Sequence, residues 1–292
     1  MTNRRAFMSE GFSINSNVDR ETPLAERLRA AARAGFSAVH WCEDLGDAAG
    51  YSPAQVEAMA ARLSEAGLAF RSMHSPFAAV PDLQSPDPAG RARAVALVRN
   101  RLAATAELGG HCLVIHSVEG HREAMPHLAD SLDRLADDCV TRGVVLAVEA
   151  QEEADAAPLF ERFPASVAGF CFDSGHCNLQ TPKTLSLLRT FRDRLCELHL
   201  HDNYGKDDDH RLPYDGTVDW PFIAGILASR NAGPALNLEV SRLTYAQGLY
   251  DPAETRLSLD SFLAEAYKRA ARLARERNAR WADARSAQGR DS

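Results

Sequence analysis

Long apolar runs, paired-cysteine motifs and glycine-rich nucleotide loops are all missing from this chain of 292 residues. No run of about 18 apolar residues occurs, so we expect no membrane span. A basic pair near the start has no apolar segment behind it, so we expect no secretory signal. The six cysteines show no Cys-x-x-Cys spacing, which favours buried, reduced thiols in a cytoplasmic protein. No Gly-x-Gly-x-x-Gly motif supports a dinucleotide fold.

Positive charge is also scarce. The 33 Lys and Arg face 40 Asp and Glu, a net charge of -7, which disfavours a general binder of polyanions. Two segments, 42–61 and 75–90, contain no Lys or Arg at all. Basic residues gather only after Tyr267, where we interpret them as the polar face of a last helix followed by a frayed tail.

Strand-like apolar runs alternate with helical patterns along the whole chain. We predict strands at Gly11–Asn15, Phe36–Trp41, Ala69–His74, Cys112–His116, Val144–Glu149, Val167–Asp173, Leu195–His201 and Ala235–Val240. We predict helices at Pro23–Ala34, 53–67, Arg91–Leu108, Glu123–Arg142, Asp155–Phe163, Pro182–Arg192, Trp220–Ser229 and Ser258–Arg277. This alternation predicts an α/β fold, a single-domain (β/α)8 TIM barrel over residues 1–280 with a polar C-terminal tail over 281–292. An open doubly wound sheet is the alternative.

Metal-ligating residue types fall at the C-terminal ends of the predicted strands. They are His74, His116, Glu149, Asp173, His176, His199, Asp208, His210 and Glu239. Barrel enzymes build their sites on this face, and imidazole and carboxylate together suit a divalent metal. A lone His or Glu at such a position is more often structural, but nine on one rim predict a metal site.

At these residues the sequence resembles the xylose-isomerase-like barrel superfamily, which contains sugar isomerases and epimerases as well as apurinic-site endonucleases of family 2. The resemblance extends to about residue 275. It is carried by Met73-His74-Ser75-Pro76, Ile115-His116-Ser117, Val148-Glu149, Phe172-Asp173-Ser174-Gly175-His176, His199-Leu200-His201-Asp202-Asn203, Asp208-Asp209-His210 and Leu238-Glu239-Val240.

The epimerase branch implies a ligand set for one divalent ion (Mn, Co, Mg or Zn), consisting of Glu149, Asp173, His199 and Glu239. Glu149 and Glu239 would also be catalytic, exchanging a carbon-bound proton through a metal-stabilised enediolate. The endonuclease branch implies additional ligands, which match His74, His116, His176, Asp208 and His210. In both branches His199 is favoured over His201, which would then contact substrate or support the ligands.

Two departures place the endonuclease below the epimerase. The segment 150–155 after Glu149 is acidic instead of rich in Thr and Gly, and the cation-free segments 42–61 and 75–90 would repel DNA phosphates. We therefore expect a metal-dependent isomerase or epimerase of a sugar, sugar phosphate or keto-sugar. A multinuclear phosphoesterase related to apurinic-site endonucleases is the alternative, and a barrel that binds without turnover is a third.

Two further residues are candidates for substrate binding. Trp41, beside His40 at the end of the second strand, can line a sugar pocket, although an ordinary rim aromatic is an equal alternative. Arg211 can hold an anionic substrate group, although most such cations are simply solvated. The expected partner is a small-molecule sugar, without nucleic acid or membrane, and the sequence leaves a homo-oligomer open.

Overall fold

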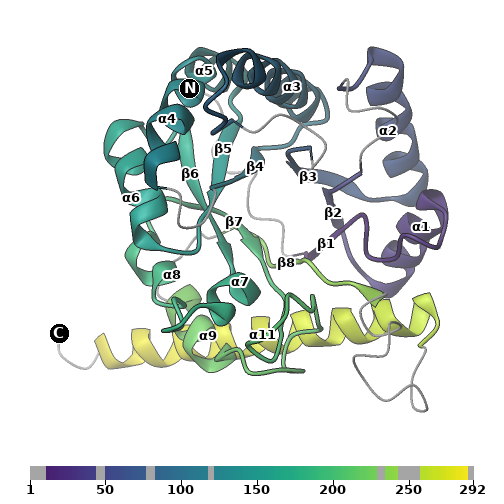
Figure 1. The fold of residues 1–292 in the computed structure, drawn as a ribbon. Coiled ribbons are helices and arrows are strands. Elements are labelled where there is room, and N and C mark those ends of the chain that lie inside the picture. The colour runs from purple at the N-terminus through teal and green to yellow at the C-terminus, as the bar shows by residue number, and fades with distance from the viewer. Residues whose placement is uncertain are drawn as a thin grey trace.

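The computed structural model describes residues 11–43, 50–76, 83–117, 122–228, 234–242 and 257–288. Within these ranges the chain alternates between strands and helices (Figure 1). The strands are β1 Ser13–Asn15, β2 Ala38–Trp41, β3 Ala69–His74, β4 Cys112–His116, β5 Val145–Glu149, β6 Ala168–Asp173, β7 Leu195–His199 and β8 Asn237–Leu238.

All eight strands run parallel in the order β7-β6-β5-β4-β3-β2-β1-β8. A parallel bridge between Leu200 and Leu238 joins the two ends of this sheet, and the amide of Glu239 donates to Leu200 O at 3.2 Å. The sheet is thereby a nearly closed barrel, with helices around its outside in Figure 1. The predicted (β/α)8 TIM barrel is confirmed.

The helices and one short 3-10 turn follow the strands in the expected alternation. They are α1 Leu24–Ala34, α2 Pro53–Ala66, α3 Pro88–Glu107, η1 Arg122–Ala124, α4 Met125–Asp133, α5 Ala136–Arg142, α6 Glu153–Arg162, α7 Ser174–Leu179, α8 Leu187–Thr190, α9 Trp220–Ala228 and α11 Leu259–Gln288. Ser52 begins α2 through the reciprocal capping contacts with Gln55 that its sequence predicts. No helix within the described ranges has the length and apolarity to cross a bilayer.

Two predicted helices differ from the structure, and one helix was not predicted. The helix predicted over Glu123–Arg142 is divided among η1, α4 and α5, and the one over Pro182–Arg192 is reduced to Leu187–Thr190. The short helix α7 was not predicted. It begins directly after β6 because the carboxylate of Asp173 accepts the amide of His176 at 2.7 Å and caps the helix.

The closing helix α11 continues to Gln288, beyond the predicted end at Arg277. An apolar stripe that includes Leu263, Ala266, Ala270 and Leu273 is buried, and α11 packs mainly on α9 and α1. Residue 280, the expected end of the barrel domain, therefore lies inside this helix, and the boundary between barrel and tail stays a prediction.

Side-chain alternation along the strands separates two kinds of packing. On β4 and β5, Leu113, Ile115, Leu146 and Val148 belong to the large buried core shared with the helices. The intervening residues face the barrel interior, where Cys112, Val114, Ala147 and Cys171 form a second, smaller cluster. Polar residues at the strand ends share the inward parity and meet at the mouth of the barrel.

Candidate metal centre

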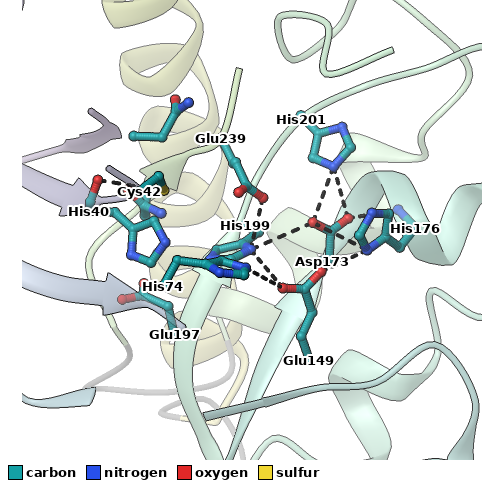
Figure 2. A network of polar contacts seen from close by, with 12 residues as sticks. His40, Cys42, His74, Glu149, Asp173, His176, Glu197, His199, His201 and Glu239 are labelled. Atoms are coloured by element: carbon teal, nitrogen blue, oxygen red, sulfur yellow. Dashed lines mark hydrogen bonds and ion pairs between the residues drawn. The ribbon is translucent and has the colours of Figure 1, made fainter. Parts of the chain in front are cut away.

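The four residues predicted to hold one metal converge on the ring of His199, at the end of β7. Its Nδ1 atom lies 2.8 Å from Oε2 of Glu239, 3.1 Å from Oε2 of Glu149 and 3.8 Å from Oδ2 of Asp173. All four side chains are buried, with His199 completely enclosed. Figure 2 shows Glu239 and Glu149 reaching His199 from different sides, with Asp173 beside them. We call these four residues the central site.

These close atoms are not arranged as ordinary hydrogen bonds. Nδ1 of His199 and Oε2 of Glu149 are buried and have no partner in hydrogen-bonding geometry among the described residues, although the imidazole and the carboxylate are within contact distance. Buried polar atoms normally find such partners. One imidazole and three carboxylates directed at a common point have the donor types and number that suit a divalent cation. The central site therefore fits a metal ion.

A second group lies on the β3–β4 side of the central site. Nε2 of His74 is 2.9 Å from Nε2 of His116, and the latter is 3.4 Å from Oε2 of Glu149. One ligand atom from each of these three residues lies within 4.8 Å of the others. This group can hold an ion that shares Glu149 with the central site.

A third group lies on the opposite side, around Asp208. Oδ2 of Asp208 is 3.4 Å from Nε2 of His176 and 2.9 Å from Nε2 of His210. His210 has a positive φ of 46°, and its Nδ1 lies 2.9 Å from the carbonyl oxygen of Glu239. Nδ1 of His176 contacts Oε1 of Glu149 at 2.7 Å, so this group also adjoins the central site.

His201, which the sequence analysis did not place among the metal ligands, occupies a different position from His199. Its Nε2 atom contacts both carboxylate oxygens of Asp173, at 3.0 and 3.1 Å, and its ring stacks on His210 with centroids 4.2 Å apart. His201 thus joins Asp173 to the third group instead of facing the three carboxylates around His199. Its assignment as a supporting residue stays a prediction.

Interactions among the buried site residues determine which of their side chains are ionised. Burial would raise the pKa of Glu149, but His116 and His199 outweigh burial and hold the pKa well below its usual range. Burial opposes the charge of Glu239 in the same way, and His199 again outweighs it and lowers the pKa. Burial lowers the pKa of His74 to about 4, with a further contribution from His116. The two glutamates are therefore ionised carboxylates, and His74 is a neutral imidazole.

Trp41 does not line the site, so its assignment as a substrate contact is corrected. The side chain is completely buried in the core outside the barrel wall, and its Nε1 donates to the hydroxyl of Tyr51 at 3.2 Å. Its neighbour His40 faces inward and lies against His199, with ring centroids 4.7 Å apart. Adjacent residues of a strand point to opposite faces, so only one of the two can reach the site.

Arg211 is also held by a protein partner instead of being presented to a substrate. The residue is 2% exposed, its Nη2 lies 2.6 Å from Oδ2 of Asp215, and its Nε donates to the carbonyl of Asp215 at 2.9 Å. The backbone of Arg211 pairs with Asp202 in an antiparallel bridge. We therefore correct its assignment: Arg211 stabilises the loop that carries Asp208 and His210.

The sequence analysis missed a buried polar group beneath the site, which we call the floor cluster: Arg71, His111, Cys112 and Glu197. Glu197 is fully buried, 3.9 Å from Nε of Arg71 and 3.5 Å from Sγ of Cys112. The signal was present on β7, because Glu197 and His199 are two residues apart and so share the inward face. The prediction used the strand ends only.

The fold of this chain is matched by known proteins. The model of the xylose isomerase-like TIM barrel family matches residues 28–276, so the chain belongs to that family. Over 286 residues the chain is 32% identical to the uncharacterized protein y4fM of Sinorhizobium fredii, covering 85% of this chain and 92% of that protein.

Solved structures share the same barrel. The D-psicose 3-epimerase of Clostridium cellulolyticum H10, with D-tagatose, superposes with a TM-score of 0.72 at 15% identity, covering 90% of this chain and 99% of that one. The 3-keto-D-glucoside 4-epimerase YcjR of E. coli gives a TM-score of 0.67 at 17% identity, covering 91% and 99%. At these identities the likeness shows the fold.

Proposed function

We propose that this protein is a metal-dependent sugar epimerase or isomerase. The observation that carries the proposal is the central site, where one imidazole and three carboxylates meet in a buried position at the mouth of the barrel. The family membership and the barrels of sugar epimerases with similar folds support the same class of reaction.

Glu149, Asp173, His199 and Glu239 would hold the metal in this proposal. A divalent ion bound there supplies positive charge beside the carbonyl and hydroxyl oxygens of a sugar. Of these residues, Glu149 and Glu239 have the chemistry to move a proton, because their lowered pKa keeps both side chains as ionised carboxylates that can accept one.

The two glutamates come from non-adjacent strands and reach His199 from different sides (Figure 2). A substrate carbon bound between them can lose a proton to one carboxylate and receive a proton from the other. Proton return on the opposite face inverts the carbon, which is epimerisation. Return by the same carboxylate to the neighbouring carbon is aldose–ketose isomerisation.

The test is turnover by metal-depleted protein to which single divalent ions are restored. Suitable probes are D-psicose, D-tagatose, L-ribulose and a 3-keto-glucoside, with Mn, Co, Mg and Zn added one at a time. We expect interconversion of at least one probe that disappears with a chelator and returns with one or two of the metals. Full activity in a rigorously metal-free preparation would contradict the proposal.

The phosphoesterase remains the second candidate, because the flanking groups around His116 and Asp208 can hold two more ions beside the central site. Several ions can activate water and stabilise the leaving oxygen of a phosphodiester. Of the acidic residues that disfavour DNA, Glu43 pairs with Arg27 and Asp87 caps α3, whereas Asp44, Asp47 and Asp82 lie outside the described residues. The argument from these acidic residues against DNA binding is therefore weaker than the sequence alone suggested.

Metal content and DNA cleavage separate these two candidates. For the epimerase we expect one tightly bound ion per chain, weaker binding of any further ion, and no cutting of a duplex with an abasic site. Metal-dependent cutting that is lost in His210→Ala would make the phosphoesterase the correct function. The cytoplasmic location and the oligomeric state stay predictions.

A further inference from the structure

Three donor atoms of different chemistry meet on the β2–β8 side of the central site. His40, Cys42 and Glu239 each place one ligand atom within 4.8 Å of the other two, and all three residues are buried. Figure 2 shows Cys42 and His40 together on the side of His199 away from Asp173. Neither His40 nor Cys42 belongs to the central site, so only Glu239 is shared.

A chain of hydrogen bonds determines which nitrogen of His40 carries the proton. Oγ of Ser72 lies 2.7 Å from Nδ1 of His40, and the same hydroxyl is hydrogen-bonded to the carboxylate of Glu197. An ionised carboxylate only accepts, so the single proton of the hydroxyl goes to Glu197. The hydroxyl oxygen must then accept from His40, which places the ring proton on Nδ1 and leaves a lone pair on Nε2.

That lone pair has no partner among the described residues. Nε2 of His40 is buried without a hydrogen bond, and the residue as a whole is 0% exposed. The amide of Cys42 is fixed by Oγ of Ser16 at 2.9 Å, which sets the position of the thiol next to the ring. A fully buried imidazole beside a thiol and a carboxylate supplies the donor set of a soft divalent-metal site.

We propose that His40, Cys42 and Glu239 form a second metal site, with a thiolate ligand, beside the central site. Small side-chain adjustments bring the three donors onto one ion, and binding releases the thiol proton of Cys42 to solvent. Zn²⁺ and Co²⁺ accept sulfur, nitrogen and oxygen ligands, whereas Mg²⁺ prefers oxygen alone. Ser72 and Glu197 are positioning residues, since they act only through the tautomer of His40.

A second thiol lies close to residues of the central site. Cys171, on β6, has a ligand atom within 4.8 Å of those of Glu149 and His199. A metal bound through Cys171 would reuse two ligands of the central site and would sit in the apolar cluster of the barrel interior. The site containing Cys42 shares only Glu239 with the central site and does not involve that apolar cluster. The two thiols therefore make opposite predictions for the same spectroscopic signal.

Titration of the metal-free, full-length protein with Co²⁺ tests this proposal, because thiolate-bound cobalt has a sulfur-to-metal charge-transfer absorption in the near ultraviolet. We expect that absorption in the wild type and in Cys171→Ala, and its loss in Cys42→Ala and Cys42→Ser with the central ion retained by elemental analysis. Ser72→Ala should weaken formation of the band by about 10–100-fold, the usual cost of losing a residue that orients a ligand. Mg²⁺ should leave the band unformed and Zn²⁺ should remove it by displacement.

Cys139, a buried core residue of α5, provides the matched control, and Cys139→Ala should leave the cobalt spectrum unchanged. Circular dichroism establishes that each variant is folded before its titration. Absence of the band in folded wild type with excess cobalt would overturn the proposal. Persistence of the band in Cys42→Ser together with its loss in Cys171→Ala would overturn it as well. Neither result depends on whether the protein is an epimerase.

Discussion

The mouth and the floor of this barrel contain the same types of residue in opposite arrangements. At the floor, Nδ1 of His111 is 3.0 Å from the carbonyl oxygen of Arg71, and Nε2 is 3.1 Å from that of Cys196. Carbonyl oxygens only accept, so both ring nitrogens of His111 carry protons and the ring is a cation. At the mouth, Nδ1 of His199 faces three carboxylates, and no described residue forms a hydrogen bond with it.

This difference in hydrogen bonding distinguishes the polar cluster at the floor from the one at the mouth. Burial would lower the pKa of His111, but Cys112 and Glu197 outweigh burial and raise it to about 9. At the mouth, burial, with a contribution from His199, lowers the pKa of His40 to about 3. Burial would also lower the pKa of His199, but Cys171, Glu239 and Glu149 outweigh burial and raise it well above its ordinary value. At the floor, both ring nitrogens of His111 lie against carbonyl oxygens. At the mouth, Nε2 of His40 and Nδ1 of His199 have no hydrogen-bond partner among the described residues. Available, buried nitrogen atoms are what a metal centre requires.

The largest expected effect comes from one substitution made at the mouth. Glu239→Gln keeps the shape of the side chain but removes a base and a metal ligand. We expect turnover to fall by about 10²–10⁴-fold or more, the usual contribution of a proton-transferring group. The thermal midpoint should stay near that of the wild type, which scanning calorimetry can verify. Near-normal turnover in this variant would remove Glu239 from the catalytic set.

The same substitution at the floor should have the reverse outcome. Glu197→Gln leaves the charges of Arg71 and His111 buried without their carboxylate, which costs about 3–5 kcal/mol of unfolding free energy. Turnover per folded molecule should fall far less than in Glu239→Gln, because Glu197 does not touch the central site. Urea denaturation and steady-state kinetics on the same preparations provide the two measurements. A stable but inactive Glu197→Gln protein would show that the floor participates in the reaction.

A pH series sharpens the contrast further. The folded pKa of His111, about 9, exceeds its ordinary value of 6.5, so protonated His111 stabilises the fold. Its contribution is complete below pH 6.5 and is lost as the pH rises through about 9. The difference in unfolding free energy between the wild type and His111→Gln should therefore shrink over that interval. A difference that is independent of pH would mean that His111 is neutral in the folded protein.

The smallest effect is expected for Trp41, which lies outside the barrel wall. Trp41→Phe removes the hydrogen bond to Tyr51 and should lower the unfolding free energy by about 1 kcal/mol or slightly more. The KM for a sugar substrate should stay unchanged. His40→Gln is the informative comparison, since His40 faces the site. A large rise in KM for Trp41→Phe alone would restore the original assignment of this tryptophan.

The sequence predicts the barrel and the residues of its mouth because both depend on strand alternation. Glu149, Asp173 and His199 are each the last residue of a strand, and parallel strands in one barrel end at the same rim. The same alternation could also have identified two inward-facing residues that the sequence analysis did not assign to the site. Glu197 shares the face of His199, and His40, not Trp41, has the inward parity.

Other features depend on contacts that no local pattern specifies. Strand β8 is only Asn237–Leu238 because the following residues bond elsewhere, with the amide of Val240 donating to the side chain of Asn15. The pairing of Arg211 with Asp215 depends on the fold of the loop that contains both. The end of α11 at Gln288 lies beyond the apolar stripe that predicted the helix.

Hydrogen exchange at a sugar carbon tests the central claim most directly. The metal-loaded protein is incubated with D-psicose or D-tagatose in deuterated water, and the sugar is analysed by proton NMR and mass spectrometry. The account predicts deuterium on the carbon next to the carbonyl, with the signal absent after chelation and in both Glu149→Gln and Glu239→Gln. Interconversion of the sugars without deuterium incorporation, or incorporation that persists in both variants, would contradict the proton exchange assigned to the two glutamates.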